Sequence, residues 1–188
     1  LSNYPGFFAG GGVKSGGPVL IYWPALVDSK HINEVVHFNG KSKELKPTSQ
    51  LNFEEIYYQT EPVKIPDAPK GETSHVPLGT LFGARSGDKG GCANLGVWAK
   101  DLDAFAFLSS FLTIEKLKEL MPDLKEFKIE RFDLPNILSL NFYIHDILED
   151  GVSSNSRKDA QAKSLGEYIR AKKANIPSSL LETLNESR

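Results

Sequence analysis

A glycine-rich stretch with three charged residues separates two short apolar runs near the middle of the chain. The stretch covers residues 83–94, and the apolar runs cover residues 77–82 and 95–99. Both runs are typical of strands, because they are short, bounded by glycine and rich in Leu, Val and aromatic residues. A P-loop and a dinucleotide fingerprint each lead into a helix, whereas this stretch leads into a strand. We therefore predict neither nucleotide hydrolysis nor a Rossmann domain.

The glycine-rich stretch is expected to be a loop that binds an anion. Four glycines fall within residues 83–91, and glycine lets a ligand approach bare backbone amides. Arg85 and Lys89 would add positive charge, and Asp88 would neutralise that pair or act as a base. The predicted anion-binding residues are Arg85, Ser86, Gly87, Lys89, Gly90, Asn94 and Asn136. The alternative is an ordinary hairpin loop whose glycines serve only the turn and whose charges are solvated.

Composition limits the class of protein. The chain has 188 residues, a hydrophobic content of 40% and a net charge of −2, which fits a folded domain with an appended segment. The charge argues against a nucleic-acid partner, and no apolar run is long enough to cross a bilayer. The single cysteine, Cys92, cannot form an intrachain disulfide, which fits a cytoplasmic or another reducing intracellular compartment. No metal site and no cofactor are predicted.

Residues 1–70 are expected to be a β-rich segment and a linker. The first eighteen residues are too rich in glycine and proline for a helix, so they form a ligand-closing loop or a connector. Residues 19–23 are predicted to be a strand, Asn39-Gly40 to be a hairpin turn, and residues 50–58 to be a strand or a helical turn. Three prolines and one glycine between residues 61 and 72 favour an extended linker.

Residues 71–176 are expected to form a compact α+β domain. Strands are predicted over 77–86, 94–100, 125–132 and 137–148. One helix would run from a cap at Asp101 or Asp103 to Met121, with a break at Thr113, and a second would cover 157–174. Because the helices do not alternate with the strands, we predict an antiparallel sheet with two helices on one face. Phe105 lies outside the apolar stripe of the first helix, and residues 177–188 are expected to be a polar tail or a docking helix.

A second group of polar residues lies near the fourth predicted strand. Arg131, Asp133 and Asn136 precede it, and Asn141 and His145 share one of its faces. His145 is a candidate general acid or base, together with Asp88 in the loop. The alternative is a polar strand face with an ordinary hydrogen-bonded histidine. This face carries no predicted helix, so it is expected to meet solvent or a partner.

Several separated motifs resemble the AtuA-like family, the acyclic terpene utilisation proteins, long treated as a domain of unknown function. These motifs are Ala84-Arg85-Ser86-Gly87-Asp88-Lys89-Gly90, Ala93-Asn94-Leu95-Gly96-Val97, Arg131-Phe132-Asp133-Leu134-Pro135-Asn136, Leu140-Asn141-Phe142 and Gly151-Val152-Ser153. The resemblance implies a ferredoxin-like module at the C-terminus. It also implies that residues 1–70 are the end of a larger N-terminal domain, the rest of which would precede Leu1.

The resemblance further implies a role in the breakdown of acyclic terpenes and branched acids, whose intermediates are CoA thioesters. It assigns no reaction type, so two functions remain open. In the first, the module is part of an enzyme and its glycine-rich loop holds an acyl-CoA-type or carboxylate ligand. In the second, it is a non-catalytic module that joins subunits of a homo-oligomer across the open sheet face.

Overall fold

The structure is a computed structural model, which describes residues 16–18, 20–21, 23–45 and 62–186. The chain divides into two compact units, one formed by residues 1–22 and 63–188 and the other by residues 23–62. The predictions for residues 1–15 and 50–58 lie outside the described residues. The predicted strand over 19–23 is wrong where it can be checked, because Leu20, Ile21 and Trp23 belong to no strand.

The larger unit is built on a four-stranded antiparallel sheet. Its strands are β4 (Gly83–Lys89), β5 (Cys92–Trp98), β6 (Ile129–Leu134) and β7 (Ser139–Ile144), in the order β4-β5-β7-β6. Successive residues of β5 and β7 alternate between buried and half-buried, as expected for a sheet with one covered face. The predicted α+β class with an antiparallel sheet is confirmed, and so is the alternation of the fourth strand.

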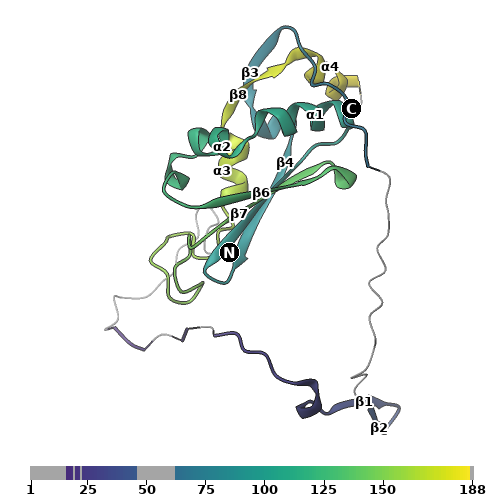
Figure 1. The fold of residues 1–188 in the computed structure, drawn as a ribbon, viewed down its shortest axis with the longest axis vertical. Helices are drawn as coiled ribbons and strands as arrows, with labels where there is room; N and C mark the ends of the chain where they lie inside the picture. Colours follow the sequence, from purple (N-terminus) through teal and green to yellow (C-terminus); the bar gives the residue numbers. More distant parts are fainter. Residues whose placement is uncertain (1–15, 19, 22, 46–61, 187–188) are drawn as a thin grey trace. The chain divides into compact units, whose positions relative to one another are not determined.

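The helices cover the buried face of this sheet. Helices α1 (Leu102–Phe111) and α2 (Ile114–Leu120) run along one side of it (Figure 1), and α3 (Leu165–Ala171) packs on β4. The predicted caps are confirmed, since Asp101 accepts a hydrogen bond from the Ala104 amide at 2.8 Å and Thr113 accepts one from the Lys116 amide at 3.1 Å. Phe105, which lies outside the apolar stripe, is nevertheless fully buried, because α1 is enclosed on all sides over residues 104–108.

The glycine-rich stretch is not a long loop. Residues 83–89 continue into β4 and residues 92–98 form β5, so only Gly90 and Gly91 remain for the turn. Gly90 has φ +64°, as such tight turns require. An added Cβ at Gly91 would lie 2.2 Å from the Glu149 carbonyl oxygen, so both turn positions favour glycine. The predicted loop is corrected to a two-residue hairpin turn.

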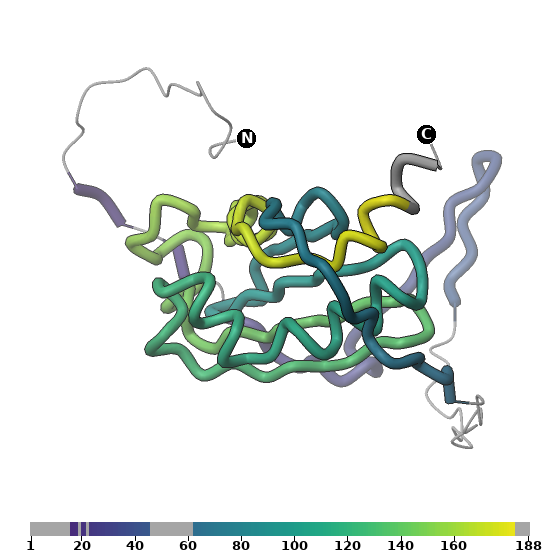
Figure 2. The backbone as a smooth tube through the Cα atoms, turned by 90° about the horizontal axis from the view of Figure 1, so that it is seen from above, coloured from purple at the N-terminus to yellow at the C-terminus, as the bar shows by residue number. Residues whose placement is uncertain are grey.

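A second, smaller sheet lies outside the predicted order. Strand β3 (Thr73–Pro77) pairs antiparallel with β8 (Lys173–Pro177), and Figure 2 shows these two traces side by side. Short 3₁₀ helices lie at Leu78–Thr80, Pro122–Leu124 and Pro135–Ile137. The last predicted helix is therefore shorter than expected. The predicted tail begins with α4 (Ser178–Glu186), where Leu180 is buried.

The strand order has a consequence for the ferredoxin-like pattern. In that pattern the strand after the second helix returns to the sheet. Here β8 follows α3 but pairs with β3 and not with the main sheet. Strand β4, which comes first in the chain among the four strands of the main sheet, lies at its edge beside β5. The result keeps a four-stranded sheet covered by helices on one face. It also makes β4 an edge strand, which brings the glycine-rich residues to the rim of the sheet.

The smaller unit contains a 3₁₀ helix at Ser29–His31 and one hairpin, formed by β1 (Glu34–Phe38) and β2 (Lys41–Leu45). The predicted Asn39-Gly40 turn is confirmed, and both residues have positive φ values, 48° and 71°. This geometry is that of a two-residue type I′ turn.

Ser86 links β4 to α3, and this link generates the first prediction. Its buried hydroxyl oxygen accepts a hydrogen bond from the Gly166 amide at 2.9 Å. Ser86→Ala should lower the free energy of unfolding by about 1–3 kcal/mol, because it leaves a buried amide without an acceptor. Urea unfolding followed by circular dichroism measures this change. The control Ser110→Ala removes an exposed hydroxyl on α1 and should change stability by less than about 0.5 kcal/mol. Equal effects of the two substitutions would contradict the role of Ser86.

Candidate functional site

The candidate site is the face of the four-stranded sheet opposite the helices, here called the open face. Strand pairing arranges its side chains in three rows that cross all four strands. The apolar row is Gly83, Trp98, Ser139 and Leu134; the central row is Arg85, Gly96, Asn141 and Phe132; and the charged row is Gly87, Asn94, Tyr143 and Glu130. Four of the predicted site residues, Arg85, Gly87, Asn94 and Lys89, belong to this face.

The apolar row exposes large side chains. Trp98 is 41% exposed, and Leu134 is equally exposed at the far edge of the sheet. The Trp98 ring lies over Gly83, because a Cβ built on that glycine would come within 2.2 Å of the ring. Glycine at this position therefore lets the indole lie flat across the β4 end of the row. Phe132 in the central row and Ile137 in the adjoining 3₁₀ helix are also exposed, at 47% and 65%.

The central row is polar in its middle. The Asn94 amide donates to the Asn141 side-chain oxygen at 3.3 Å, which connects this row with the charged row. Arg85 is exposed at the β4 edge, and its side chain makes no hydrogen bond or ion pair with another residue that the structure describes. Its guanidinium is therefore available to a partner or a ligand.

Lys163 reaches the open face from the loop before α3. Asp159 holds that loop, since its carboxylate accepts hydrogen bonds from the amides of Lys163 and Ser164 at 2.9 and 2.7 Å. A Cβ built on Gly87 would lie 2.8 Å from the Lys163 Nζ, so the ammonium group occupies the space above this glycine. The same Nζ lies 3.9 Å from a carboxylate oxygen of Asp88. Lys163 was not predicted, because no local pattern brings residue 163 to β4.

A recess of about 180 Å³ lies beside these cations at the β4 edge. It is lined by Ala84, Arg85, Ser86, Lys163, Gly166 and Glu167. The cationic pair at this edge is therefore Arg85 with Lys163. Lys89 lies beyond it, where its Nζ donates to the Asp88 carbonyl oxygen at 2.8 Å. The turn residue Gly90 and the exposed Asn136, in the 3₁₀ helix after β6, do not line the recess.

The β6 edge of the open face, which lies opposite the β4 edge, carries titratable groups. The His145 Nε2 and the Lys128 Nζ lie 3.0 and 2.9 Å from the same Glu130 oxygen. The hydrogen bond with Lys128, and after it the one with His145, lowers the pKa of Glu130 from its ordinary 4.5. Tyr143 meets the His145 ring edge-on, and a hydrogen bond with Cys92 is the main reason that the pKa of Tyr143 is raised.

The two tentative catalytic residues are not brought together. Asp88 pairs with Ala93, whose side chain is buried under the helices, whereas His145 lies beside Tyr143 and Glu130 of the open face. A shared proton-transfer role for Asp88 and His145 has no geometric support. A catalytic role for either residue alone stays a prediction.

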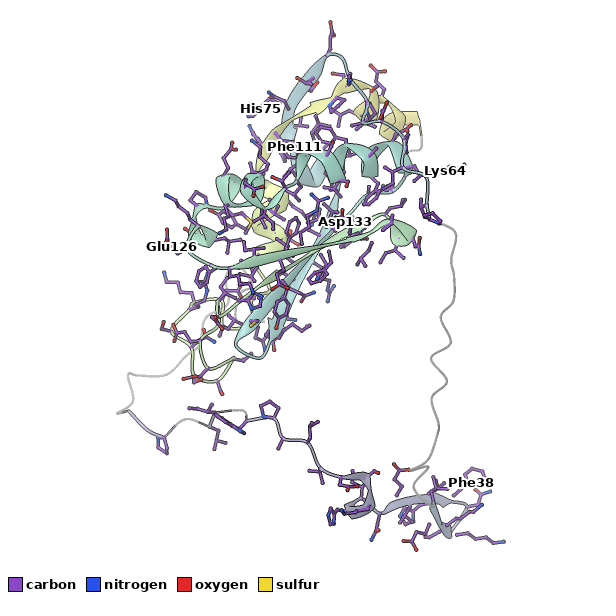
Figure 3. The ribbon with its side chains drawn as sticks, in the orientation of Figure 1. Phe38, Lys64, His75, Phe111, Glu126 and Asp133 are labelled. Carbon is purple, nitrogen blue, oxygen red and sulfur yellow. The ribbon has the colours of Figure 1, made fainter. Side chains whose placement is uncertain are left out.

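Arg131 and Asp133 are also separated from Asn141 and His145. They belong to the helix side of β6, which Figure 3 illustrates through the labelled Asp133. Arg131 donates to Asp133 at 2.7 Å, to the Leu112 carbonyl at 3.1 Å and to the Ser109 hydroxyl at 3.0 Å. These bonds tie the end of α1 to β6, so Arg131 has a structural role. Among the described residues, no cluster of His, Cys, Asp and Glu could hold a metal ion, and no helix is long and apolar enough to cross a membrane.

The environment of Glu130 generates the second prediction. Because its folded-state pKa is lowered, the carboxylate contributes to stability above pH 4.5, and that contribution disappears as the pH falls through the lowered value. Lys128→Met should raise the pKa of Glu130 toward 4.5, measured from the pH dependence of its carboxyl ¹³C chemical shift. Lys125→Met, an exposed change on the preceding turn, should leave it unchanged. An unaltered pKa in the Lys128 variant would refute this account.

One comparison with known protein families gives a match for this chain. The model of the AtuA ferredoxin-like domain matches residues 76–175, which is more than half of the chain. No curated protein and no solved structure matches the chain. The matched region contains all four strands of the main sheet together with α1, α2 and α3. The chain therefore belongs to the AtuA ferredoxin-like domain family.

Proposed function

We propose that this domain is an interaction module whose open face binds a protein surface. The observation that supports the proposal is the group of exposed large apolar side chains on that face, namely Trp98, Phe132 and Leu134, which are between 41% and 47% exposed. Single exposed apolar residues are ordinary on protein surfaces, but a contiguous group rimmed by polar residues marks an interface. The polar rows beside it would fix the orientation of the partner.

A second observation fits binding better than catalysis. Arg85, Asn94 and Asn141 supply a cation and amides across the middle of the sheet, where strand pairing holds their backbones rigid. The proton-transfer groups, by contrast, are dispersed, since Asp88 and His145 lie on opposite sides of the sheet. Aromatic residues and arginine are enriched in interface centres, and Trp98, Phe132 and Arg85 provide both types here.

Site-specific photo-crosslinking tests the interaction function and gives the third prediction. A benzoyl-phenylalanine introduced in place of Phe132 should form a covalent adduct with a protein segment, in the purified chain or in an extract of the source cells. The same group in place of Leu102, which is 41% exposed on α1, is the matched control and should form none. Mass spectrometry identifies the attached segment. Absence of an adduct at position 132 under both conditions would refute the interaction function.

The recess at the β4 edge supports a second candidate, the binding of an anionic ligand. Arg85 and Lys163 line it together, and two cations beside a recess suit a carboxylate or a phosphate. The resemblance to acyclic terpene utilisation proteins makes a CoA thioester of a short branched acid the first ligand to test. This ligand class, and with it a place in branched-acid breakdown, is a proposal that rests on the resemblance, whereas the two cations support an anionic ligand in general.

Ligand-dependent thermal stability tests this candidate and is the fourth prediction. A short acyl-CoA at a hundred times its dissociation constant should stabilise the protein by about 2.7 kcal/mol, which corresponds to roughly 5–10 °C in melting temperature. Arg85→Ala should abolish the shift, whereas Lys100→Ala, an exposed change outside the recess, should retain it. A melting temperature that does not respond to CoA, acyl-CoA or free carboxylates would exclude this site.

A further inference from the structure

We propose that the partner of the open face is a second copy of this chain, bound face to face about a two-fold axis parallel to the strands. This inference rests on the proposed interaction function and adds the identity of the partner. Rotation about this axis places each row of one copy opposite the same row of the other copy. It also places the β4 edge of one sheet opposite the β6 edge of the other. Residues of β4 then face residues of β6, and residues of β5 face residues of β7.

The edge residues are complementary in every row under this operation. In the apolar row, the Trp98 ring that covers Gly83 at the β4 edge would meet Leu134 at the β6 edge of the other copy. In the central row, the Arg85 guanidinium would meet the exposed Phe132 ring, a cation–π contact. In the charged row, the Lys163 ammonium above Gly87 would meet the Glu130 carboxylate. Each contact occurs twice because the axis is two-fold.

The two middle strands are complementary in size. Trp98 would lie opposite Ser139, and Gly96 would lie opposite Asn141. Each pair combines a larger side chain with a smaller one, as the interdigitated layers of two packed sheets require. The packed sheets would keep their strand directions within about 30° of each other, which preserves the row-to-row alignment over this short distance.

The other two-fold axis in the sheet plane, perpendicular to the strands, is disfavoured by charge. It would place β4 opposite β4, so that Arg85 would face Arg85 in the central row. It would also place the apolar row opposite the charged row, so that Leu134 would be buried against Glu130. Like charges and unpaired buried charges both oppose association. The distribution of residues on this face therefore favours one orientation of the second copy.

The size of the face predicts a reversible dimer. Four strands about 4.8 Å apart and three rows about 7 Å apart span roughly 20 Å by 20 Å. This footprint is smaller than the about 800 Å² per partner of standard interfaces. We therefore expect association in the micromolar range, with monomer and dimer both present on dilution.

Charge reversal tests the arrangement and is the fifth prediction. Sedimentation of the full chain over a range of concentrations should show a monomer–dimer equilibrium. Glu130→Lys and Lys163→Glu should each weaken association by about tenfold, because each creates two like-charge contacts. The double variant should restore association. Within one chain these residues lie at opposite edges of the sheet, so a restored intramolecular pair cannot explain that rescue. Circular dichroism verifies that each variant is folded.

Two results would overturn the proposal: a chain that is monomeric at every attainable concentration, or a dimer that none of the three variants alters. If a charge reversal prevents folding, crosslinking from position 132 replaces it, and the adduct should map to β4 of a second copy. An adduct at position 132 to residues 1–61 of the same chain, or to another protein, would overturn the homodimer while leaving the interaction function intact. Absence of any adduct would refute both the homodimer and the interaction function.

Discussion

The structure depends on the two-residue alternation of the central strand β5. Ala93, Leu95 and Val97 point to the helices and are essentially fully buried, and the residues between them point the other way. Because three helices already cover the first side, the opposite side is left without a layer of its own from the described part of this unit. A sheet in this position either carries polar side chains or meets a partner. This sheet does both, with polar groups in its middle and apolar groups at one end.

Alternation is also what the sequence predicts best. The burial of Leu140, Phe142 and Ile144 and the opposite direction of Asn141 and Tyr143 follow from their spacing alone. The caps at Asp101 and Thr113 were recognisable because a side-chain oxygen three residues before a free amide is a local feature. The open face could therefore be anticipated, including its lack of a helix. The family resemblance that was stated on the sequence motifs is confirmed over residues 76–175.

The errors come from interactions between distant segments. The glycine-rich stretch was predicted as a loop because glycine is common in turns, yet Gly83 lies within the strand where the Trp98 ring crosses over it. Strand β8 was not predicted, and its first two residues were placed in the last helix, because its pairing partner β3 lies about a hundred residues earlier in the chain. The proximity of Glu130 to His145 was not predicted, because it depends on the register between β6 and β7. The secondary-structure propensities of single residues contain no information about such contacts between distant segments.

Arg85 and Lys163 belong to both proposed sites, and this overlap constrains how they could work together. An anion in the recess would engage the same guanidinium and ammonium groups that would face Phe132 and Glu130 in the proposed dimer. If the two occupants compete for these side chains, a ligand that binds the monomer more tightly shifts the equilibrium toward the monomer. Linkage then requires that dimerisation weakens ligand binding by the same factor. Ligand binding at the β4 edge would therefore weaken self-association, and self-association would weaken ligand binding. Lys163, whose ammonium group lies above Gly87, would couple the two because it takes part in both.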